Sequence, residues 1–398
     1  MSDNELYSLA AKLFAEHSRW QDVGEAEATG WAQQLWKALQ QTGFSDVPVP
    51  EELGGAGGSV ADAVQLLRAA GAHAAPVPLA EAGLVGGWLL TSAGLVLPKG
   101  VRTVLPPAAT RRLRLDGDRL FGTVPAVAWG HRAEHVIGLV DGVVVLAPGP
   151  AAQSGGPAVS RGANLADEPR DTVIFDGVPV TARADAPDEV TEQTFWERTA
   201  LGRAALMAGA VSAVAAMTLR YSREREQFGR PIGRFQAVQA HLVTIHQQAA
   251  VVASAIDGAV GAVELGRGGF EIACAKMLAD RAAQLVTAAA HQTHGAIGMT
   301  KEYPLHYLTR RLWAWRDEAG AHYRWADRLS AALVACGPDA LYPAIQCGSE
   351  VVQSTDCSAK TGLRWLSRCT TRRRRVCRFC SHTVSAPPRV CGTPISMP

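Results

Sequence analysis

Apolar residues recur at the spacing of an α-helix through the first hundred positions of the chain. The repeat is clearest over residues 6–14 and 31–39, where apolar side chains return every three or four positions. Pro48, Pro50 and the glycine cluster at 54–58 interrupt this pattern. We predict an α-helical domain over residues 1–99.

The pattern changes to short β-type runs between residues 100 and 190. The runs cover residues 112–115, 136–140, 143–146 and 172–175. Asp-Gly turn signals follow at positions 116–117, 141–142 and 176–177. Strands at this spacing predict a small β-barrel or β-sandwich over residues 100–190.

Long helical patterns return after residue 191. They cover residues 192–223, 236–265, 270–293 and 305–334, which predicts a four-helix bundle over residues 191–334. The expected fold class is therefore α+β and mainly α, with an N-terminal helical domain, a middle β domain and a C-terminal bundle.

The longest apolar stretch, residues 83–98, is too short to cross a bilayer and is interrupted by glycine, serine and threonine. It predicts a pair of buried helices. At the start of the chain no basic residue precedes an apolar core, as a secretory signal would require. We expect a cytoplasmic protein that is not associated with a membrane.

The last part of the chain differs from the rest in its net charge and its cysteine content. The whole chain carries +2, but residues 357–398 hold one lysine, eight arginines and no acid, so this segment carries +9 and the remainder −7. We interpret residues 335–398 as a basic tail, either disordered or the product of a change of reading frame, that binds polyanions weakly and no specific nucleic acid. Cys377 and Cys380 have zinc-ligand spacing without a second pair, so we predict no metal site.

The segment at residues 220–233 is the strongest candidate for chemistry. It combines four arginines with two aromatic residues, and Gly229, Pro231 and Gly233 end the preceding helical pattern. The forked donors of arginine match phosphate oxygens, and glycine lets a backbone approach closely. The segment suits an anionic ligand, and a solvated helix end is the alternative interpretation.

This segment resembles the Arg-x-Gln-Phe-Gly-x-Pro-Ile signature of the acyl-CoA dehydrogenase family. Residues 292–298 are similar to the family's Gln-x-x-Gly-Gly-x-Gly element, with Ala296 in place of a glycine, and the family's Glu-Tyr-Pro follows at 302–304. The resemblance covers most of residues 1–334 and suggests a short bacterial type of the family. The family's order of helical domain, β domain and bundle agrees with the pattern of the chain.

The resemblance implies FAD as cofactor, placed between the β domain and the bundle and shared with a neighbouring subunit. By the matched positions, Arg225 would contact the FAD diphosphate and Phe228 would lie against the dinucleotide. Gln292 and Gly295 would line the adenosine end from a second subunit.

The β domain departs from the family pattern beside the flavin ring. Where relatives commonly carry Trp-x-Thr, this chain offers residues 126–129, with Ala128 and Trp129 nearest to the ring and no threonine hydroxyl. Trp129 would either cover the ring or belong to the core.

The implied reaction is the flavin-dependent α,β-dehydrogenation of an acyl-CoA thioester. A carboxylate removes the α proton while the β hydrogen leaves as hydride to the flavin. Many relatives carry this base before a glycine near the start of the last helix, where this chain has Ala319 before Gly320. Asp317 and Glu318 would point elsewhere on a continuous helix, because each residue turns by about 100°.

Other relatives carry the base as Glu-Arg at the start of the first bundle helix. Glu197 and Arg198 stand close to that place, but the positions in register are Thr199 and Ala200. Glu197 is the candidate base, and an ordinary glutamate of the first helical turns is the alternative.

Three functions remain open at this level. The chain is a self-sufficient acyl-CoA dehydrogenase, a base-lacking subunit whose homologous partner supplies the glutamate, or a non-catalytic binding or scaffold protein on the same fold. The resemblance implies a homodimer, homotetramer or hetero-oligomer, acyl-CoA as substrate and electron-transfer flavoprotein as acceptor. The acyl group itself is not predicted.

Overall fold

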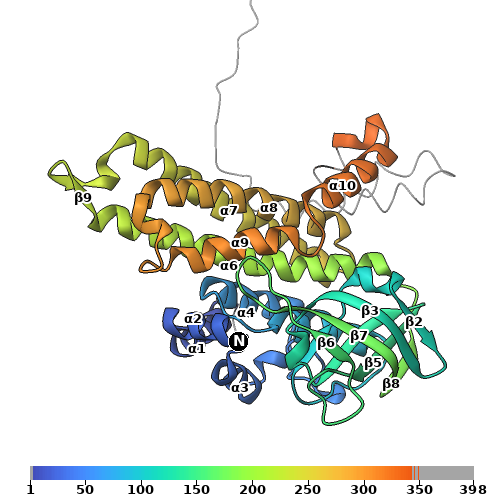
Figure 1. Cartoon of the computed structure of the whole chain (residues 1–398). Helices are drawn as coiled ribbons and strands as arrows, with labels where there is room; N and C mark the ends of the chain where they lie inside the picture. Colours follow the sequence, from blue (N-terminus) through green and yellow to red (C-terminus); the bar gives the residue numbers. More distant parts are fainter. Residues whose placement is uncertain (1–2, 343–344, 346–347, 349–398) are drawn as a thin grey trace, which may run out of the picture.

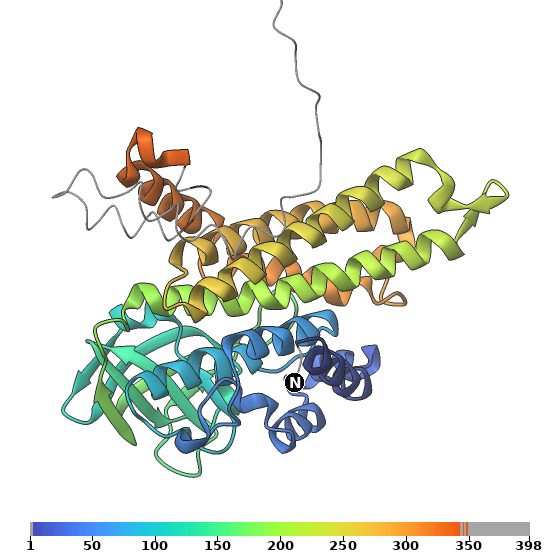
Figure 2. The ribbon, with the colours of Figure 1, turned by 180° about the vertical axis from the view of Figure 1, so that it is seen from behind.

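The computed structural model describes residues 3–342, 345 and 348 of the chain. A helical N-terminal domain and a β domain lie side by side beneath a long helical bundle (Figure 1). Seen from behind, one helix of the bundle runs along the top of both domains (Figure 2). The predicted fold class and the order of its three parts are confirmed by this arrangement. Most of the predicted basic tail, including Cys377 and Cys380, lies outside the described residues.

The N-terminal domain is helical, as the apolar repeat predicts. Its elements are α1 (Asp3–His17), α2 (Trp20–Thr29), α3 (Gln33–Gln41), η1 (Phe44–Asp46), η2 (Glu51–Leu53), α4 (Val60–Ala72), η3 (Ala80–Gly87) and α5 (Trp88–Ser92). The predicted pair of buried helices within residues 83–98 is a buried π-helix, η3, that continues into α5.

The β domain is a sandwich of two four-stranded sheets. One sheet has the order β1 (Arg102–Val104), β4 (His135–Val140), β5 (Val143–Pro148), β8 (Ala182–Asp185), and the other β2 (Leu113–Asp116), β3 (Arg119–Ala128), β7 (Arg170–Pro179), β6 (Ala158–Ser160). Only β1 and β4 pair in parallel, and apolar side chains of both sheets share one core. The short helices η4 (Pro107–Arg111) and η5 (Gly130–Arg132) connect strands.

The sequence pattern missed the long strand β3. Gly122 and Pro125 interrupt its apolar alternation, and the sheet accommodates the proline at an irregularity between Val124 and Val127. A bulge of this kind lets a strand continue through residues that usually end one.

The bundle contains α6 (Glu192–Glu224), α7 (Gln236–Glu264), α8 (Gly269–His294), α9 (Leu305–Asp317) and α10 (His322–Cys336), with η7 (Gly295–Met299) after α8 and η8 (Pro338–Ala340) after α10. The predicted single helix over 305–334 is wrong. It is broken into α9 and α10 because Ala319 and Gly320 adopt φ of 55° and 85°, in the left-handed region that a continuing helix excludes. We call residues 318–321 the α9–α10 link.

Helix α6 is the central element of the molecule. An 18-residue window of it is long and apolar enough to cross a membrane, but 83% of that window is buried inside the protein. Glycines bring it unusually close to α4, because a Cβ on Gly71 would lie 2.0 Å from the Leu206 carbonyl oxygen and one on Gly209 1.9 Å from that of Arg68. The burial identifies α6 as the core helix of the bundle.

A two-stranded hairpin joins α6 to α7 at the end of the bundle farthest from the β domain (Figure 1). It consists of β9 (Glu226–Gln227) and β10 (Arg230–Pro231), followed by η6 (Ile232–Arg234). Phe228 and Gly229 form the turn with φ of 53° and 74°, as a two-residue hairpin turn requires.

Candidate functional site

A cavity of about 510 Å³ lies where the three domains meet, and we call it the interdomain cavity. The π-helix η3 contributes Ala80, Glu81 and Val85 to its wall. The β domain contributes residues 104–107, Ala126, Ala128, residues 163–165 and Arg170, and the bundle Trp196, Thr199, Arg203, Trp313, Ala314 and residues 317–319. Its lining is mostly apolar with a polar end, which is typical of a site for a small organic ligand.

Glu318 lines this cavity, contrary to the prediction that it would point elsewhere. The prediction assumed a continuous helix, but α9 ends at Asp317 and the rotation per residue no longer applies. The Glu318 carboxylate accepts hydrogen bonds from Arg170 Nε at 2.8 Å and Asn164 Nδ2 at 2.9 Å, and it lies 2.8 Å from Arg203 Nε.

These contacts make Glu318 a poor general base. Burial alone would raise the pKa of its carboxyl group, but the positive charges of Arg170 and Arg203 and the hydrogen bonds outweigh burial and hold the pKa at about 2. A general base works best with a pKa near the operating pH. Glu318 therefore stays ionised and paired, and it ties the α9–α10 link to the β domain and to α6.

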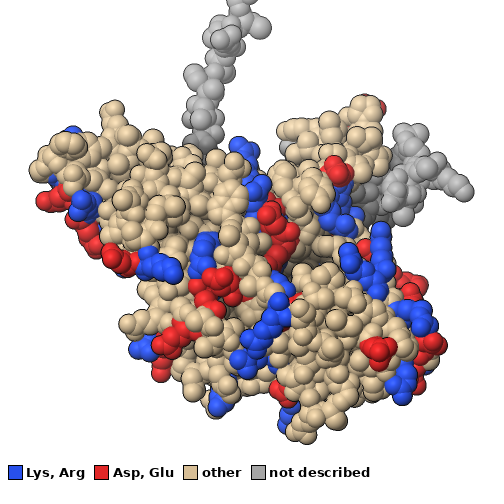
Figure 3. Space-filling model, in the orientation of Figure 1, with Lys and Arg blue, Asp and Glu red and all other residues tan. Residues whose placement is uncertain are grey.

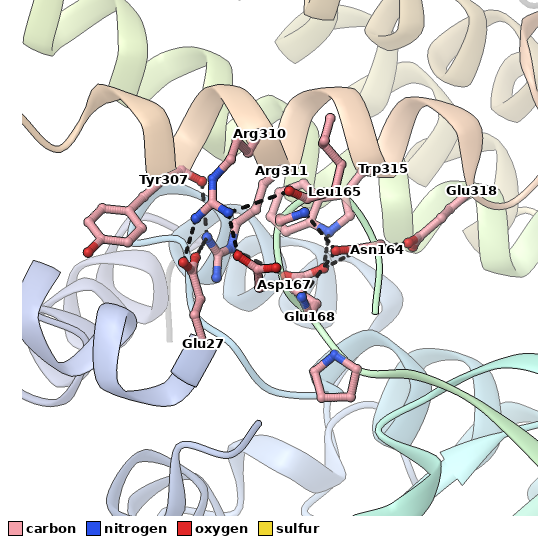
Figure 4. A network of polar contacts seen from close by, with 12 residues as sticks. Glu27, Asn164, Leu165, Asp167, Glu168, Tyr307, Arg310, Arg311, Trp315 and Glu318 are labelled. Atoms are coloured by element: carbon pink, nitrogen blue, oxygen red, sulfur yellow. Dashed lines mark hydrogen bonds and ion pairs between the residues drawn. The ribbon is translucent and has the colours of Figure 1, made fainter. Parts of the chain in front are cut away.

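Through Asn164, Glu318 belongs to a polar network that also contains Glu168, Arg311 and Glu27 (Figure 4). Glu168 is 1% exposed and accepts hydrogen bonds from Arg170 Nη2 at 3.0 Å and Trp315 Nε1 at 2.9 Å. Arg311 reaches Glu168 on one side and Glu27 of α2 on the other, at 3.3 and 2.7 Å. The network joins all three domains by buried charges.

Ala319 also lines the cavity, at the position where the resemblance would place a base. The link that carries it is held from the bundle side. The fully buried Lys276 donates to the carbonyls of Arg316 and Gly320 at 2.9 and 3.3 Å, and Trp325 Nε1 donates to that of Ala319 at 3.1 Å. The link has a fixed shape, but its side chain at 319 is a methyl group.

Two other carboxylates line the cavity. Glu81 is buried and forms an ion pair with Arg203, whereas Asp317 is exposed to solvent. None of the carboxylates on the described lining is both buried and free of a guanidinium. The cavity therefore lacks the partly desolvated, unpaired base that proton abstraction requires.

Glu197, the candidate base, does not line the interdomain cavity. Its carboxylate forms an ion pair with Arg328 of α10 and accepts a hydrogen bond from Gln193 Nε2 at 3.1 Å. Thr199, the position in register with the relatives' base, does line the cavity, but its hydroxyl donates to the Phe195 carbonyl at 2.8 Å. This geometry argues against Glu197 as the base.

Of the two β-domain candidates, Ala128 lines the interdomain cavity, whereas Trp129 does not. Trp129 is 2% exposed, and the Arg170 guanidinium lies over its ring at 5.0 Å from the centroid. Its indole therefore supports the arginine that holds Glu318.

The four remaining predicted residues lie at the other end of the bundle. Arg225 is the exposed C-cap residue of α6, and Phe228 at the hairpin tip is 92% exposed. A large aromatic side chain that is exposed at a positive φ is unfavourable for an isolated chain. The exposed tip of the hairpin is therefore a candidate binding surface.

Gln292 and Gly295 lie next to this hairpin end, on the last turn of α8 and at the start of η7. Gly295 has φ 65° and ψ −143°, a conformation that is essentially restricted to glycine, and no heavy atom lies within 4 Å of a Cβ built on it. Both residues are exposed, so a ligand has room to approach the loop.

An aromatic stack brings the three matched motifs together at this end. The Tyr221 and His294 rings stack with centroids 4.4 Å apart, and His294 lies 4.9 Å from Tyr303. Tyr221 comes from the first motif, His294 from the second and Tyr303 from the third, so segments about 70 residues apart in sequence form one local structure. The sequence indicated each motif but not this stack.

The two candidate regions are far apart within one chain. Thr199 lies on α6 and Arg225 caps its C-terminal end, and at 1.5 Å per residue about 40 Å separates them. A flavin dinucleotide is too short to span that distance. One chain therefore presents two separate candidate regions, one at each end of α6.

The residues at the two ends fit FAD unequally. At the bundle end, an exposed arginine and an open glycine loop suit a diphosphate and a nucleoside. In the interdomain cavity, Pro106 and Pro107 have no N–H, and the side-chain donors of Asn164 and Arg170 are already used by carboxylates and by the Pro169 carbonyl, so these four residues offer no donor to the polar edge of a flavin ring. Within the described part of the chain, no group of three or more His, Cys, Asp or Glu side chains is placed to hold a metal ion.

Two family models match the chain. The model for the acyl-CoA dehydrogenase N-terminal domain matches residues 2–95, and the model for the acyl-CoA dehydrogenase C-terminal domain matches residues 190–321. Acyl-CoA dehydrogenase IpdE2 of Mycobacterium tuberculosis is 30% identical over 318 residues, which cover 77% of this chain and 89% of that protein.

Solved structures share the fold. A variant of the steroid ACAD named Tcur3481-Tcur3483 is 28% identical with a TM-score of 0.74, covering 83% of this chain and 96% of that chain. The ChsE4-ChsE5 complex from Mycobacterium tuberculosis is 23% identical with a TM-score of 0.76, covering 83% of this chain and 97% of that chain. The name of each of these two structures lists two proteins.

Proposed function

The chain belongs to the acyl-CoA dehydrogenase family, whose members are oxidoreductases acting on CH–CH bonds, and on this premise we propose that it is the base-lacking subunit of a hetero-oligomeric acyl-CoA dehydrogenase. In this assembly a homologous partner chain supplies the catalytic carboxylate. The reaction is the α,β-dehydrogenation of an acyl-CoA thioester.

One observation carries the proposal: the interdomain cavity holds a methyl group at position 319 where proton abstraction would need a carboxylate. The nearest acid, Glu318, is committed to Arg170 and Arg203. Removal of a well-placed general base typically costs about 10²- to 10⁴-fold in rate. A chain with this cavity contributes to catalysis more effectively by completing a partner's site than by using its own.

This chain contributes to the FAD site the end of its bundle that carries the β9–β10 hairpin and η7. Arg225 would bind the FAD diphosphate through paired, charge-assisted hydrogen bonds, Phe228 would cover the dinucleotide, and Gln292 and Gly295 would receive its adenosine end. FAD, when bound, supplies the acceptor for the hydride. The residues of this chain hold it and exclude water around the diphosphate.

The surface of the bundle supports an assembly of subunits. Charged side chains of both signs gather along the seam between the bundle and the other domains, whereas the face formed by α7 and α8 is largely uncharged (Figure 3). Helix α7 contains no lysine or arginine, and its Val243 and Val251 are 54% and 42% exposed. Extended uncharged faces of this kind are typical of subunit interfaces. The two-component names of the structural relatives agree with a mixed assembly.

An absorbance spectrum tests the proposal. The full chain is purified alone and after co-expression with homologous chains encoded beside it. We expect no flavin absorbance from the chain alone and a yellow, active complex with the right partner. A yellow homomer that turns over acyl-CoA without a partner would refute the proposal.

The self-sufficient enzyme with Glu197 as base is the second candidate, and Glu197→Gln separates it from the first. The proposed subunit keeps its turnover within about twofold in the complex, whereas loss of a true base lowers turnover by about 10²- to 10⁴-fold. The third alternative is a scaffold protein that binds no flavin. It predicts that Arg225→Ala changes only the surface charge of the chain.

Two further parts of the proposal rest on the family and on the sequence. Electron-transfer flavoprotein is proposed as the acceptor of electrons from the assembly. A cytoplasmic location is proposed from the burial of α6 inside the protein.

A further inference from the structure

His294 occupies an unusual position directly before Gly295. Its side chain is 4% exposed and its ring contacts the rings of Tyr221 and Tyr303, which also contact each other. Its Nδ1 lies 2.8 Å from the Ala290 carbonyl oxygen. A carbonyl oxygen only accepts, so Nδ1 carries the proton and Nε2 presents a lone pair. Nε2 is buried and has no hydrogen-bond partner among the described residues.

The loop η7 is built against this histidine. The Tyr221 hydroxyl donates to the His294 carbonyl oxygen at 3.3 Å, which fixes the point where α8 ends and η7 begins. Gly298 folds back so closely that a Cβ on it would lie 2.9 Å from the His294 Cβ. The start of η7 and Gly298 therefore lie against the backbone and Cβ of His294, and the ring of His294 ties this residue to Tyr221 and Tyr303.

We propose that His294 is a positioning residue for η7, the adenosine-side loop of the FAD site, and that it holds this loop only as the neutral imidazole. The inference rests on the proposed function to the extent that η7 binds FAD. The inference adds that FAD binding by η7 depends on pH.

Protonation would disturb the stack for a physical reason. A proton on Nε2 creates a second donor and a positive charge on a buried atom that has no hydrogen-bond partner in the described part of the chain. Burial already lowers the pKa of His294; its hydrogen bond to Ala290 opposes this, and the neighbouring His291 lowers the pKa further. The titratable and charged groups around the stack are Arg220, Tyr221 and Glu224 of α6, His291 of α8, Tyr303 of the following turn and His306 of α9.

The sign of the pH effect follows from the direction of this shift. In an opened loop His294 regains its ordinary pKa of 6.5, whereas in the closed loop its pKa is lower. The closed form is fully favoured above pH 6.5 and loses stability as the pH falls below it. Each pH unit below 6.5 therefore favours opening about tenfold, until the pKa of the closed form is reached.

The test uses the full chain in its complex with the partner. Hydrogen exchange of the amides at 295–299 and the retention of FAD, followed by the fluorescence of released flavin, are measured at pH 7.5 and 5.5. Exchange rates are corrected for their intrinsic pH dependence. We expect the wild-type loop to lose protection and FAD to bind more weakly at pH 5.5 than at pH 7.5.

His294→Phe keeps an aromatic ring in the stack and removes the titration, so its loop protection and FAD affinity should not change between the two pH values. His246→Phe is the matched control, because His246 also lies near its i−4 carbonyl, that of Leu242 at 2.9 Å, but is exposed. This control should keep the wild-type response. If His294→Phe does not fold, His294→Gln serves the same purpose.

A wild-type pH response in both position 294 variants, or protection of η7 that is independent of pH in the wild type, overturns the inference. A pH-dependent η7 in a complex that binds no FAD at any pH supports the role of His294 and refutes the proposed function instead.

Discussion

Replacement of Arg203 by methionine should destabilise the protein strongly, because this guanidinium pairs with two buried carboxylates. Arg203 has 8% of its side chain exposed and contacts Glu81 and, at 2.8 Å, Glu318. Methionine fills a similar volume but leaves both acids without this cation. Loss of one partner of a buried pair typically costs about 3–5 kcal/mol.

The shift at Glu318 gives an independent magnitude. Its pKa of about 2 lies well below its ordinary value of 4.5. At about 1.4 kcal/mol per unit this difference corresponds to about 3 kcal/mol of stability at neutral pH, part of which depends on Arg170. Because the folded pKa is depressed, this stability is present above pH 4.5 and is lost as the pH falls toward 2.

Urea unfolding followed by tryptophan fluorescence measures the effect. We expect Arg203→Met to lower the free energy of unfolding by about 3 kcal/mol at pH 7, with a smaller difference from wild type below pH 4. Arg281→Met, at an exposed arginine of α8, is the control and should change it by less than about 0.5 kcal/mol. A loss below about 1 kcal/mol at pH 7, or a difference that does not shrink in acid, would refute the reasoning about this network.

Three further predictions concern the bundle and its contact with α4. Arg225→Ala should weaken FAD retention in the complex by about 10- to 100-fold, since a hydrogen bond to a charged group contributes about 1.5–3 kcal/mol, while Arg234→Ala at another exposed arginine should have little effect. Gly295→Ala should weaken FAD retention by about tenfold or more through backbone strain alone, because no atom lies near its Cβ; unchanged retention would show that the positive φ is not needed. Gly71→Ala should lower the free energy of unfolding in urea by about 2 kcal/mol or more, because its Cβ would meet the Leu206 carbonyl, whereas Gly258→Ala, with open space around it, should be neutral or stabilising.

Much of the fold follows from apolar periodicity. The bundle helices α6, α7 and α8 begin and end within two residues of the predicted bounds, because their repeats are long and uninterrupted. The break between α9 and α10 was not predictable from that repeat, since apolar spacing continues across it. The left-handed conformation of Ala319 is a tertiary effect, stabilised by Lys276 and Trp325.

The two candidate regions also differ in how far the sequence alone predicts them. The motifs at 220–233 and 292–298 are local in sequence, so the hairpin end could be located without a structure. The interdomain cavity could not, because Glu81, Arg170, Arg203 and Glu318 come from four elements and meet only after folding. The role of Glu318 depends on where a helix stops, and sequence patterns define such ends poorly.

The length of α6 has a consequence for how the protein can diverge. Substitutions more than about 10 Å apart with no shared partners have nearly independent effects, and the cavity end and the hairpin end of this helix are about 40 Å apart. Selection can therefore discard the chemistry at one end while it preserves binding at the other. After a gene duplication, two sister chains on such a scaffold can divide one ancestral task between them without either losing its fold.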